Sequence, residues 1–409
     1  MEVQQALLEL YRTVFTYPAI DNHAHAFLKV EHRDAVPFEG LISEASGPAL
    51  TEDSVHTLAC YRATAQLGKL FGLSSTADWE DVKRARKAMD YIQLCRMCMD
   101  PTRIQCILID DGLGNNDLVY DYQWHDQFTK SHTRRIVRVE VLAENILRDL
   151  IPLELESEEG MHIPHLAHNF VVRLTAELTA CATDPEVAGF KSIACYRTGL
   201  DIAVSQDGRE MEITLVTIVL RYESLKTLRL ADKALNDYVV NTTLRIAGQY
   251  GKPVQFHTGL GDNDISLSKS TPALMQPIIK AYPSTKIVLL HSAYPFTQEA
   301  GYLTAVYRNV YLDFGEVFPF VSADGQRDIV KQVLELCPTN KIMWSTDGHY
   351  WPESYYLGTL QAREVVYQVL EASIRRGELT LPQAKGIVKR AFFENANKVY
   401  NLGLSPCEM

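Results

Sequence analysis

The sequence predicts an α/β protein, a (β/α)8 barrel of the TIM type with helical insertions. From residue 16 onward, short apolar runs alternate with longer segments of helical period, and eight such runs are present. Alternating strand and helix units form parallel sheets, and eight units are the number that closes into a barrel. The predicted strands are residues 17–23, 103–110, 135–142, 189–196, 253–258, 286–292, 309–315 and 341–347.

The segments between the runs have the apolar spacing of amphipathic helices. Several of them end in Gly or Pro, which terminate helices because Gly adopts the left-handed conformation and Pro lacks an N–H. The clearest candidates are residues 78–100, 224–251, 271–283 and 324–338.

We expect the 409 residues to form a single barrel domain over 1–409. A barrel of this type takes about 250 residues and can exceed about 400 with insertions, so the length does not require a second domain. Two long excursions, at about 26–100 and 143–188, are largely helical in pattern. We expect these insertions to pack near the mouth of the barrel.

The net charge of −11 argues against a nucleic acid or an anionic membrane as partner, because both would require a basic surface. No apolar run approaches the roughly 20 residues of a membrane span, and the amphipathic N-terminus lacks the features of a signal peptide. The expected location is therefore cytoplasmic and the expected partner a small-molecule substrate. A homo-oligomer is compatible with the sequence.

The eight cysteines lie mostly in apolar segments, which favours reduced, buried thiols over a disulfide framework. Cys95 and Cys98 form a CxxC motif, but no second pair of ligands lies nearby to complete a zinc site. We interpret this pair as structural.

Polar residues stand at the ends of several predicted strands, where the active site of a barrel lies. His23 and His25 close the first strand, and alternation along an extended chain puts both imidazoles on one side, about 6–7 Å apart at the backbone. The remaining strand-end residues of this kind are Lys191, His257, His291 and Asp347. A single buried His is usually a hydrogen-bonded core residue, but six costly polar groups at strand ends together predict a metal site.

Further polar residues near the strand ends are candidates for substrate binding. Arg197 follows the Lys191 strand, where a guanidinium could bind a carboxylate through two parallel hydrogen bonds. The other candidates are Tyr196, Asp262, Glu140 and Glu316, while Asp110, Asp111 and His349 also lie near strand ends. A salt bridge or a loop contact remains the alternative role for each of them.

The segments IDNHAH, GFKS, VQFHTG, LLHSAYP and STDGH resemble, in order and spacing, the motif of the amidohydrolase superfamily. Over nearly the whole chain, segments such as PFEGLISEASGPAL, GFKSIACYRTGL and AFFENANKVYNL resemble the amidohydrolase domain of fungal FluG and plant nodulin–glutamine synthetase fusion proteins. Those fusions continue into a glutamine synthetase-like domain, whereas this chain stops shortly after its last predicted helix. Ligase activity is therefore not expected.

The resemblance implies one divalent ion bound by His23, His25 and Asp347, and a second bound by His257 and His291. Lys191, neutral or carbamylated, would bridge them, since a protonated ammonium cannot bind a cation. Zinc is the expected metal, as one or two ions, and it would lower the pKa of a water and polarise the substrate carbonyl. The implied catalytic residues are Asp347 as general base, with Lys191 and His291.

The leading hypothesis is hydrolysis of an amide, with a γ-glutamyl-type isopeptide as the substrate class suggested by the resemblance. The alternative is a non-oxidative decarboxylase of an aromatic or related acid, because some relatives bind one metal through a DxHxH-like first strand, and Asp21 fits that pattern. Lys191 argues against it, since a bridging Lys serves a two-metal hydrolytic site. A third hypothesis is a catalytically inactive barrel used for binding.

Overall fold

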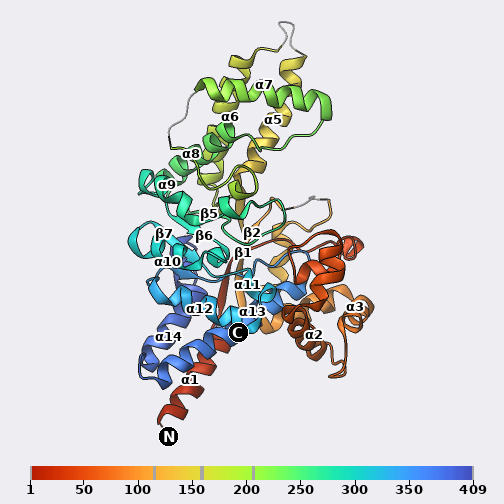
Figure 1. Cartoon of the computed structure of the whole chain (residues 1–409), viewed down its shortest axis with the longest axis vertical. Coiled ribbons are helices and arrows are strands. Elements are labelled where there is room, and N and C mark those ends of the chain that lie inside the picture. Colours follow the sequence, from red (N-terminus) through yellow and green to blue (C-terminus); the bar gives the residue numbers. More distant parts are fainter. Residues whose placement is uncertain (1, 114–116, 157–160, 205–207, 408–409) are drawn as a thin grey trace.

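Eight parallel strands run in sequence order around a barrel, which confirms the predicted fold (Figure 1). The computed structural model describes residues 2–113, 117–156, 161–204 and 208–407. The strands are β1 Ala19–Ala24, β2 Ile104–Asp110, β3 Arg134–Arg138, β4 Val187–Ser192, β5 Val254–Phe256, β6 Ile287–Leu289, β7 Val310–Asp313 and β8 Ile342–Met343. Each strand pairs with the next in parallel register.

Backbone hydrogen bonds also join the first strand to the segment that follows β8. Asp347 N donates to His23 O at 3.0 Å, and His25 N donates to Gly348 O at 2.7 Å. This seam closes the barrel and sets Asp347 directly beside His23 in β1 and His25 just after it.

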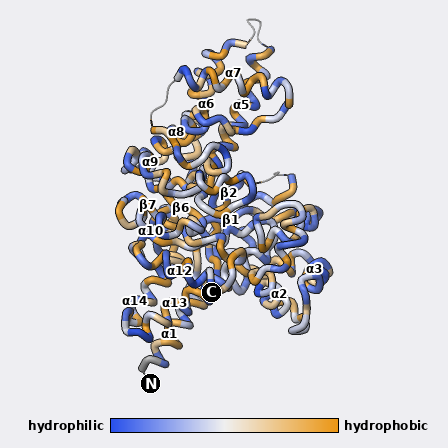
Figure 2. The backbone as a smooth tube through the Cα atoms, viewed as in Figure 1, coloured by the Kyte–Doolittle hydropathy of each residue, from blue (hydrophilic) through white to orange (hydrophobic). Residues whose placement is uncertain are grey.

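The barrel interior is filled by an apolar cluster to which most strands contribute residues, including Ile20, Leu108, Ile136 and Val288. At one end it packs against the C-terminal segment, which contributes Phe393, Ala396, Val399 and Tyr400. Figure 2 shows hydrophobic and hydrophilic residues alternating along the helices that surround these strands. The strands are therefore fixed by packing from within.

The first excursion contains α2 Leu58–Leu70, α3 Trp79–Ala88 and α4 Tyr91–Met99. The prediction of one helix over 78–100 was wrong, because Asp90 begins a new helix by accepting a hydrogen bond from Gln93 N. A buried ion pair, with Arg86 Nε 2.6 Å from Glu353 Oε1, connects α3 to the helix after β8.

A lobe of four helices projects from the strands at the top of Figure 1. It consists of α5 Val139–Leu155, α6 Ile163–Thr183, α7 Gly208–Leu225 and α8 Lys233–Tyr250. The excursion expected at 143–188 accounts for α5 and α6, with residues 157–160 outside the described residues, and α7 and α8 join them from between β4 and β5. The helix expected over 224–251 begins only at Lys233.

The third predicted strand was too long. Residues 135–142 alternate like a strand, but α5 begins at Val139. The Glu140 carboxylate accepts hydrogen bonds from Ser192 Oγ and Ile193 N, at 2.7 and 3.1 Å. These bonds fix the first turn of α5 against the end of β4, so tertiary contacts override the local pattern.

The remaining helices surround the barrel or lie below it. They are α1 Glu2–Thr16, α9 Gln276–Ala281, α10 Thr297–Val306, α11 Val317–Phe320, α12 Ala323–Leu336, α13 Pro352–Arg375, α14 Leu381–Lys389 and α15 Asn395–Val399. No helix in the described part of the chain is long and apolar enough to cross a membrane.

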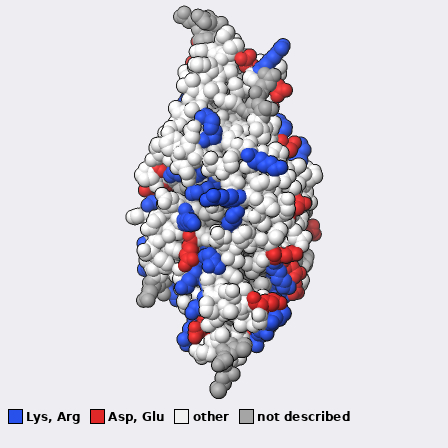
Figure 3. Space-filling model, turned by 90° about the vertical axis from the view of Figure 1, so that its left-hand side faces the viewer, with Lys and Arg blue, Asp and Glu red and all other residues white. Residues whose placement is uncertain are grey.

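All eight cysteines are free, and Cys95 and Cys98 are buried in α4, as expected of structural thiols. The surface charge is uneven. On the face in Figure 3, Lys and Arg gather near the middle and stand beside Asp and Glu in the lower half, although the whole chain carries −11.

Candidate active site

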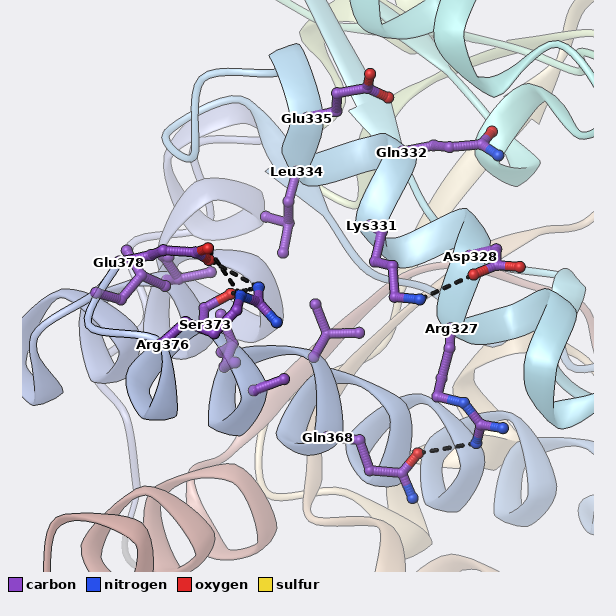
Figure 4. Close-up of a pocket in the computed structure, with 15 residues that line it drawn as sticks. Arg327, Asp328, Lys331, Gln332, Leu334, Glu335, Gln368, Ser373, Arg376 and Glu378 are labelled. Carbon is purple, nitrogen blue, oxygen red and sulfur yellow. Dashed lines mark hydrogen bonds and ion pairs between the residues drawn. The ribbon is translucent and has the colours of Figure 1, made fainter. Parts of the chain in front are cut away.

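Most of the predicted site residues line a cleft of about 310 Å³ at the carboxyl ends of the strands, but His23, His291 and Glu140 are not among its lining residues. A wider groove of about 870 Å³ lies on α12 to α14 and shares no lining residue with this cleft (Figure 4). Its charged side chains pair with one another, as Lys331 with Asp328 and Arg376 with Glu378. The cleft is lined by His25, Glu44, Leu113, Arg138, Lys191, Ile193, Tyr196, Arg197, His257, Asp262, Asp264, Glu316, Asp347, His349 and Tyr350.

His23, His25 and Asp347 converge on one point. Asp347 Oδ1 lies 3.2 Å from His23 Nε2 and 3.4 Å from His25 Nε2. Two donor atoms bound to the same zinc ion at about 2.0–2.1 Å in tetrahedral geometry are about 3.3 Å apart. Both distances from Asp347 therefore have the length expected between two ligands of a single ion.

Neighbouring acceptors fix the tautomers of both β1 histidines. His23 Nδ1 donates to Gln255 Oε1 at 2.9 Å, and His25 Nδ1 donates to the carbonyl of Asp110 at 3.1 Å. Gln255 Nε2 in turn donates to Asn22 O, which orients the amide. In both histidines Nε2 is thus the nitrogen left without an acceptor behind it, and it lies on the side of Asp347, as in metal sites whose ligands are held from behind.

His257 and His291 lie next to each other, with ring centroids 4.2 Å apart. His257 Nε2 lies 2.5 Å from Leu260 O and donates to it, which leaves Nδ1 with the free lone pair. His291 is fully buried, and neither of its ring nitrogens has a hydrogen-bond partner.

Lys191 lies between the two groups of histidines, with Nζ 3.0 Å from His23 Nε2. Burial lowers the pKa of Lys191. The negative charge of Asp110 raises this pKa and the positive charge of Arg138 lowers it, and the net shift is downward. A larger fraction of Lys191 is therefore neutral than would be the case in water. Only the neutral amine can bind a cation or react with CO2 to form a carbamate.

The donor set fits a divalent metal ion. His291 Nδ1 and Nε2, Asp347 Oδ1 and Glu316 Oε2 are all buried without a hydrogen-bond partner, which costs free energy unless something else binds them. Among the residues that the structure describes, three groups have ligand atoms within 4.8 Å of one another: His23 with His25 and Asp110, His23 with His291 and Asp347, and His257 with His291 and Glu316. Imidazole and carboxylate donors suit zinc and similar ions.

Asp110 is engaged by a neighbouring cation. Arg138 donates to Asp110 Oδ2 from both Nε and Nη2, at 3.0 and 2.6 Å. Burial alone would raise the pKa of Asp110, but the Arg138 guanidinium and the adjacent cationic groups hold it well below its usual range. Asp110 therefore acts as a charged partner beside the histidines.

The expected substrate residues Tyr196, Arg197 and Asp262 all line the cleft. The Tyr196 hydroxyl lies 3.0 Å from His257 Nε2. Arg197 has one distant ion pair, with Nη2 3.7 Å from Glu144 Oε1, and its Nε is buried without a hydrogen-bond partner. Its guanidinium is thus the least satisfied cation of the cleft.

Three other acids do not offer a free carboxylate to the cleft. Glu140 is buried against β4, as described above. Asp111 pairs with Arg135 at 2.7 Å. Asp21 accepts hydrogen bonds from the Thr346 backbone and hydroxyl and does not belong to any of the ligand groups. By contrast His349 does line the cleft, with Nδ1 3.1 Å from the carbonyl of Asp347.

Several lining residues were not foreseen, and the two with the clearest bearing on the cleft are Arg138 and Glu44. Arg138 is the last residue of β3, and the overlong strand prediction concealed its position at a strand end. Glu44 comes from the first excursion and has no sequence signal, since only the fold brings it over the cleft. Burial, together with the charges of Asp347 and Asp262, raises the pKa of Glu44 to about 8.

A sequence model of the family described as amidohydrolase matches residues 163–402, well over half of the chain. The chain belongs to the amidohydrolase family. This amidohydrolase is 41% identical to protein FluG of Emericella nidulans over 98% of its own length, and it spans 47% of FluG, about half of that protein.

Solved structures share the fold of this amidohydrolase. A protein from Lactobacillus casei assigned as a metal-dependent hydrolase has a TM-score of 0.78 and 23% identity, covering 96% of this chain and 97% of that one. A uronate isomerase from Bacillus halodurans has a TM-score of 0.66 and 12% identity, covering 98% of this chain and 97% of that one. At these identities the likeness establishes the barrel and its insertions.

Proposed function

We propose that this amidohydrolase is a metal-dependent hydrolase that cleaves an amide bond, with γ-glutamyl-type isopeptides as its substrate class. The observation that carries the proposal is the convergence of His23, His25 and Asp347 at ligand spacing, with the histidine tautomers fixed from behind. Zinc is the proposed metal, bound by these residues together with Lys191, His257 and His291. When bound, such an ion would lower the pKa of a water molecule and polarise the substrate carbonyl.

Asp347 is the proposed general base. Burial alone would raise its pKa, but the neighbouring His291, His23 and His25 hold the pKa of Asp347 well below its usual range, so it is ionised at neutral pH. Its carboxylate can accept a proton from the attacking water and pass it to the departing amine. Lys191 and His291 lie beside it and position the reacting groups.

The charges of the cleft favour a substrate that carries both a carboxylate and an ammonium. Arg197 offers a guanidinium with an unpartnered Nε for the carboxylate. Asp262 lines the same cleft as an acid, and an ammonium bound there would favour the ionised form of the neighbouring Glu44. An α-amino acid head group, as in a γ-glutamyl compound, matches this distribution of charge.

Decarboxylation is less well supported than hydrolysis. That alternative would need Asp21 as a ligand in a DxHxH-like first strand, whereas both Asp21 oxygens accept hydrogen bonds from Thr346. A barrel that only binds is also disfavoured, because a drifting site would be expected to lose some of these costly buried groups.

The direct experiment is to test the purified, metal-replete protein against a panel of γ-glutamyl amides and aromatic acids. We expect release of amine from at least one γ-glutamyl amide and no release of CO2. Formation of CO2 without amine would replace hydrolysis by decarboxylation. Cleavage of simple amides in preference to γ-glutamyl amides would retain the hydrolase and exclude the substrate class.

A further inference from the structure

The sequence suggested Glu316 as a substrate-binding residue, and its surroundings in the structure favour a role at the metal site. The side chain is 1% exposed, follows β7 and lines the cleft. Its Oε2 atom is buried without a hydrogen-bond partner. A carboxylate in this state is costly unless a cation compensates it.

We propose that Glu316 is a metal ligand that completes a second cation position with His257 and His291. The inference rests on the proposed metal-dependent function and adds a ligand to the strand-end set predicted from the sequence. The donor atoms of these three buried residues lie within 4.8 Å of one another.

The distance between His291 and Glu316 is that expected between two ligands of one metal ion. His291 Nδ1 lies 3.2 Å from Glu316 Oε2, yet neither atom has a hydrogen-bond partner, so the two groups are close but not aligned as donor and acceptor. Two ligands of one zinc ion are separated by about 3.3 Å. A residue that merely oriented the imidazole from behind would instead accept a well-aligned hydrogen bond, as Gln255 does from His23.

One carboxylate fixes the backbones of both residues relative to each other. Asp313 Oδ2 accepts hydrogen bonds from His291 N at 3.2 Å and from Gly315 N at 3.0 Å, directly before Glu316. Ser345 Oγ donates to the same oxygen at 2.9 Å. The pair is thus pre-organised by a buried network, as expected for metal ligands.

The backbone of Glu316 also adopts a conformation that non-glycine residues avoid. Its φ is 60° and its ψ −47°, and φ of His291 is 68°. Such conformations cost free energy and occur mainly where function requires a side chain to point in a particular direction. Both members of the contact carry this cost.

The test is a Co²⁺ titration of the metal-free protein, read by visible absorption and by Co²⁺ bound per chain after desalting. We expect two equivalents for the wild type and one for Glu316→Gln, whose amide oxygen is a weak ligand. The matched control is Glu140→Gln, which makes the same change at an equally buried carboxylate outside the ligand groups. It should retain two equivalents and the wild-type spectrum.

The outcomes separate this inference from the proposed function. A wild type that binds no Co²⁺ would overturn both. A wild type that binds only one equivalent, or a Glu316→Gln variant that retains two with an unchanged spectrum, would overturn the role of Glu316 alone. The Gln variant should fold, because a neutral amide costs less to bury than a carboxylate. If it does not accumulate, Glu316→Met provides the same titration.

Discussion

Replacing Gln255 by Leu should weaken metal binding without touching a metal ligand. Gln255 is fully buried in β5 and makes three hydrogen bonds that support the centre from behind. Its Oε1 accepts from His23 Nδ1 at 2.9 Å, and its Nε2 donates at 2.7 Å both to Asn22 O and to the Tyr400 hydroxyl. Leucine has nearly the same size and makes none of these bonds.

The magnitude follows from the groups that lose their partners. His23 Nδ1 and the carbonyl of Asn22 would each become buried and unpaired, at about 1–3 kcal/mol per group, so the protein should lose about 2–6 kcal/mol of stability. His23 would also be free to change tautomer and direct an N–H at the metal. Loss of such a supporting group typically lowers metal affinity by about 10–100-fold, which corresponds to about 1.4–2.8 kcal/mol.

The assay is competition for Zn²⁺ with a chelating dye, together with urea unfolding of the metal-free protein. The matched control is Asn241→Leu in α8, where a buried amide also makes three hydrogen bonds, to Ala203 O, Asp237 O and the Tyr282 hydroxyl. Both variants should lose stability, but only Gln255→Leu should lose metal affinity. Equal affinities for Gln255→Leu and the wild type would refute the reasoning, as would an equal loss in the control.

Three further substitutions test other parts of the account. Asp347→Asn should lower turnover of the amide by about 10²–10⁴-fold while part of the metal is retained; unchanged steady-state turnover would exclude a general base. Arg197→Lys should mainly raise KM for an acidic substrate, and removing the substrate carboxylate should hurt the wild type far more than the variant; equal losses would mean that the two groups do not meet. Glu353→Ala leaves Arg86 buried with only its longer contact to Asp34, Nη1 to Oδ1 at 3.6 Å, and should cost about 3–5 kcal/mol in urea unfolding, whereas a loss under about 1 kcal/mol would show that the pair with Glu353 does not secure the first excursion.

The barrel and its metal-site candidates could both be predicted from the apolar strand runs. Their number indicates the barrel, and the polar residues at their ends indicate the site. In a closed parallel barrel the carboxyl ends of all strands meet on one face, so His23, Lys191 and Asp347 could be placed together without knowing any contact. The eight predicted runs each contain the observed strand or most of it.

The remaining features depend on contacts that no local pattern records. Val139 begins a helix because Glu140 is bound by residues after β4, and this early end of β3 puts Arg138 on the cleft. Glu44 reaches the cleft through the packing of a long excursion. The position of the Glu316 side chain depends on the turn that Asp313 fixes. The sequence could therefore place Glu316 at a strand end, but it could not decide whether the carboxylate binds the metal or the substrate.

Metal content per chain tests the central claim most directly. The wild-type protein should retain at least one equivalent of zinc or a similar divalent ion in elemental analysis, and the double variant His23→Ala/His25→Ala should retain none at the centre formed with Asp347. The matched control is His132→Ala/His165→Ala, which removes two histidines with exposed side chains that pair with acids far from the cleft. We predict that this control keeps the wild-type content. A wild type with less than about a tenth of an equivalent and no gain on adding metal, or a His23/His25 variant with undiminished content, would contradict a metal centre at the carboxyl ends of these strands.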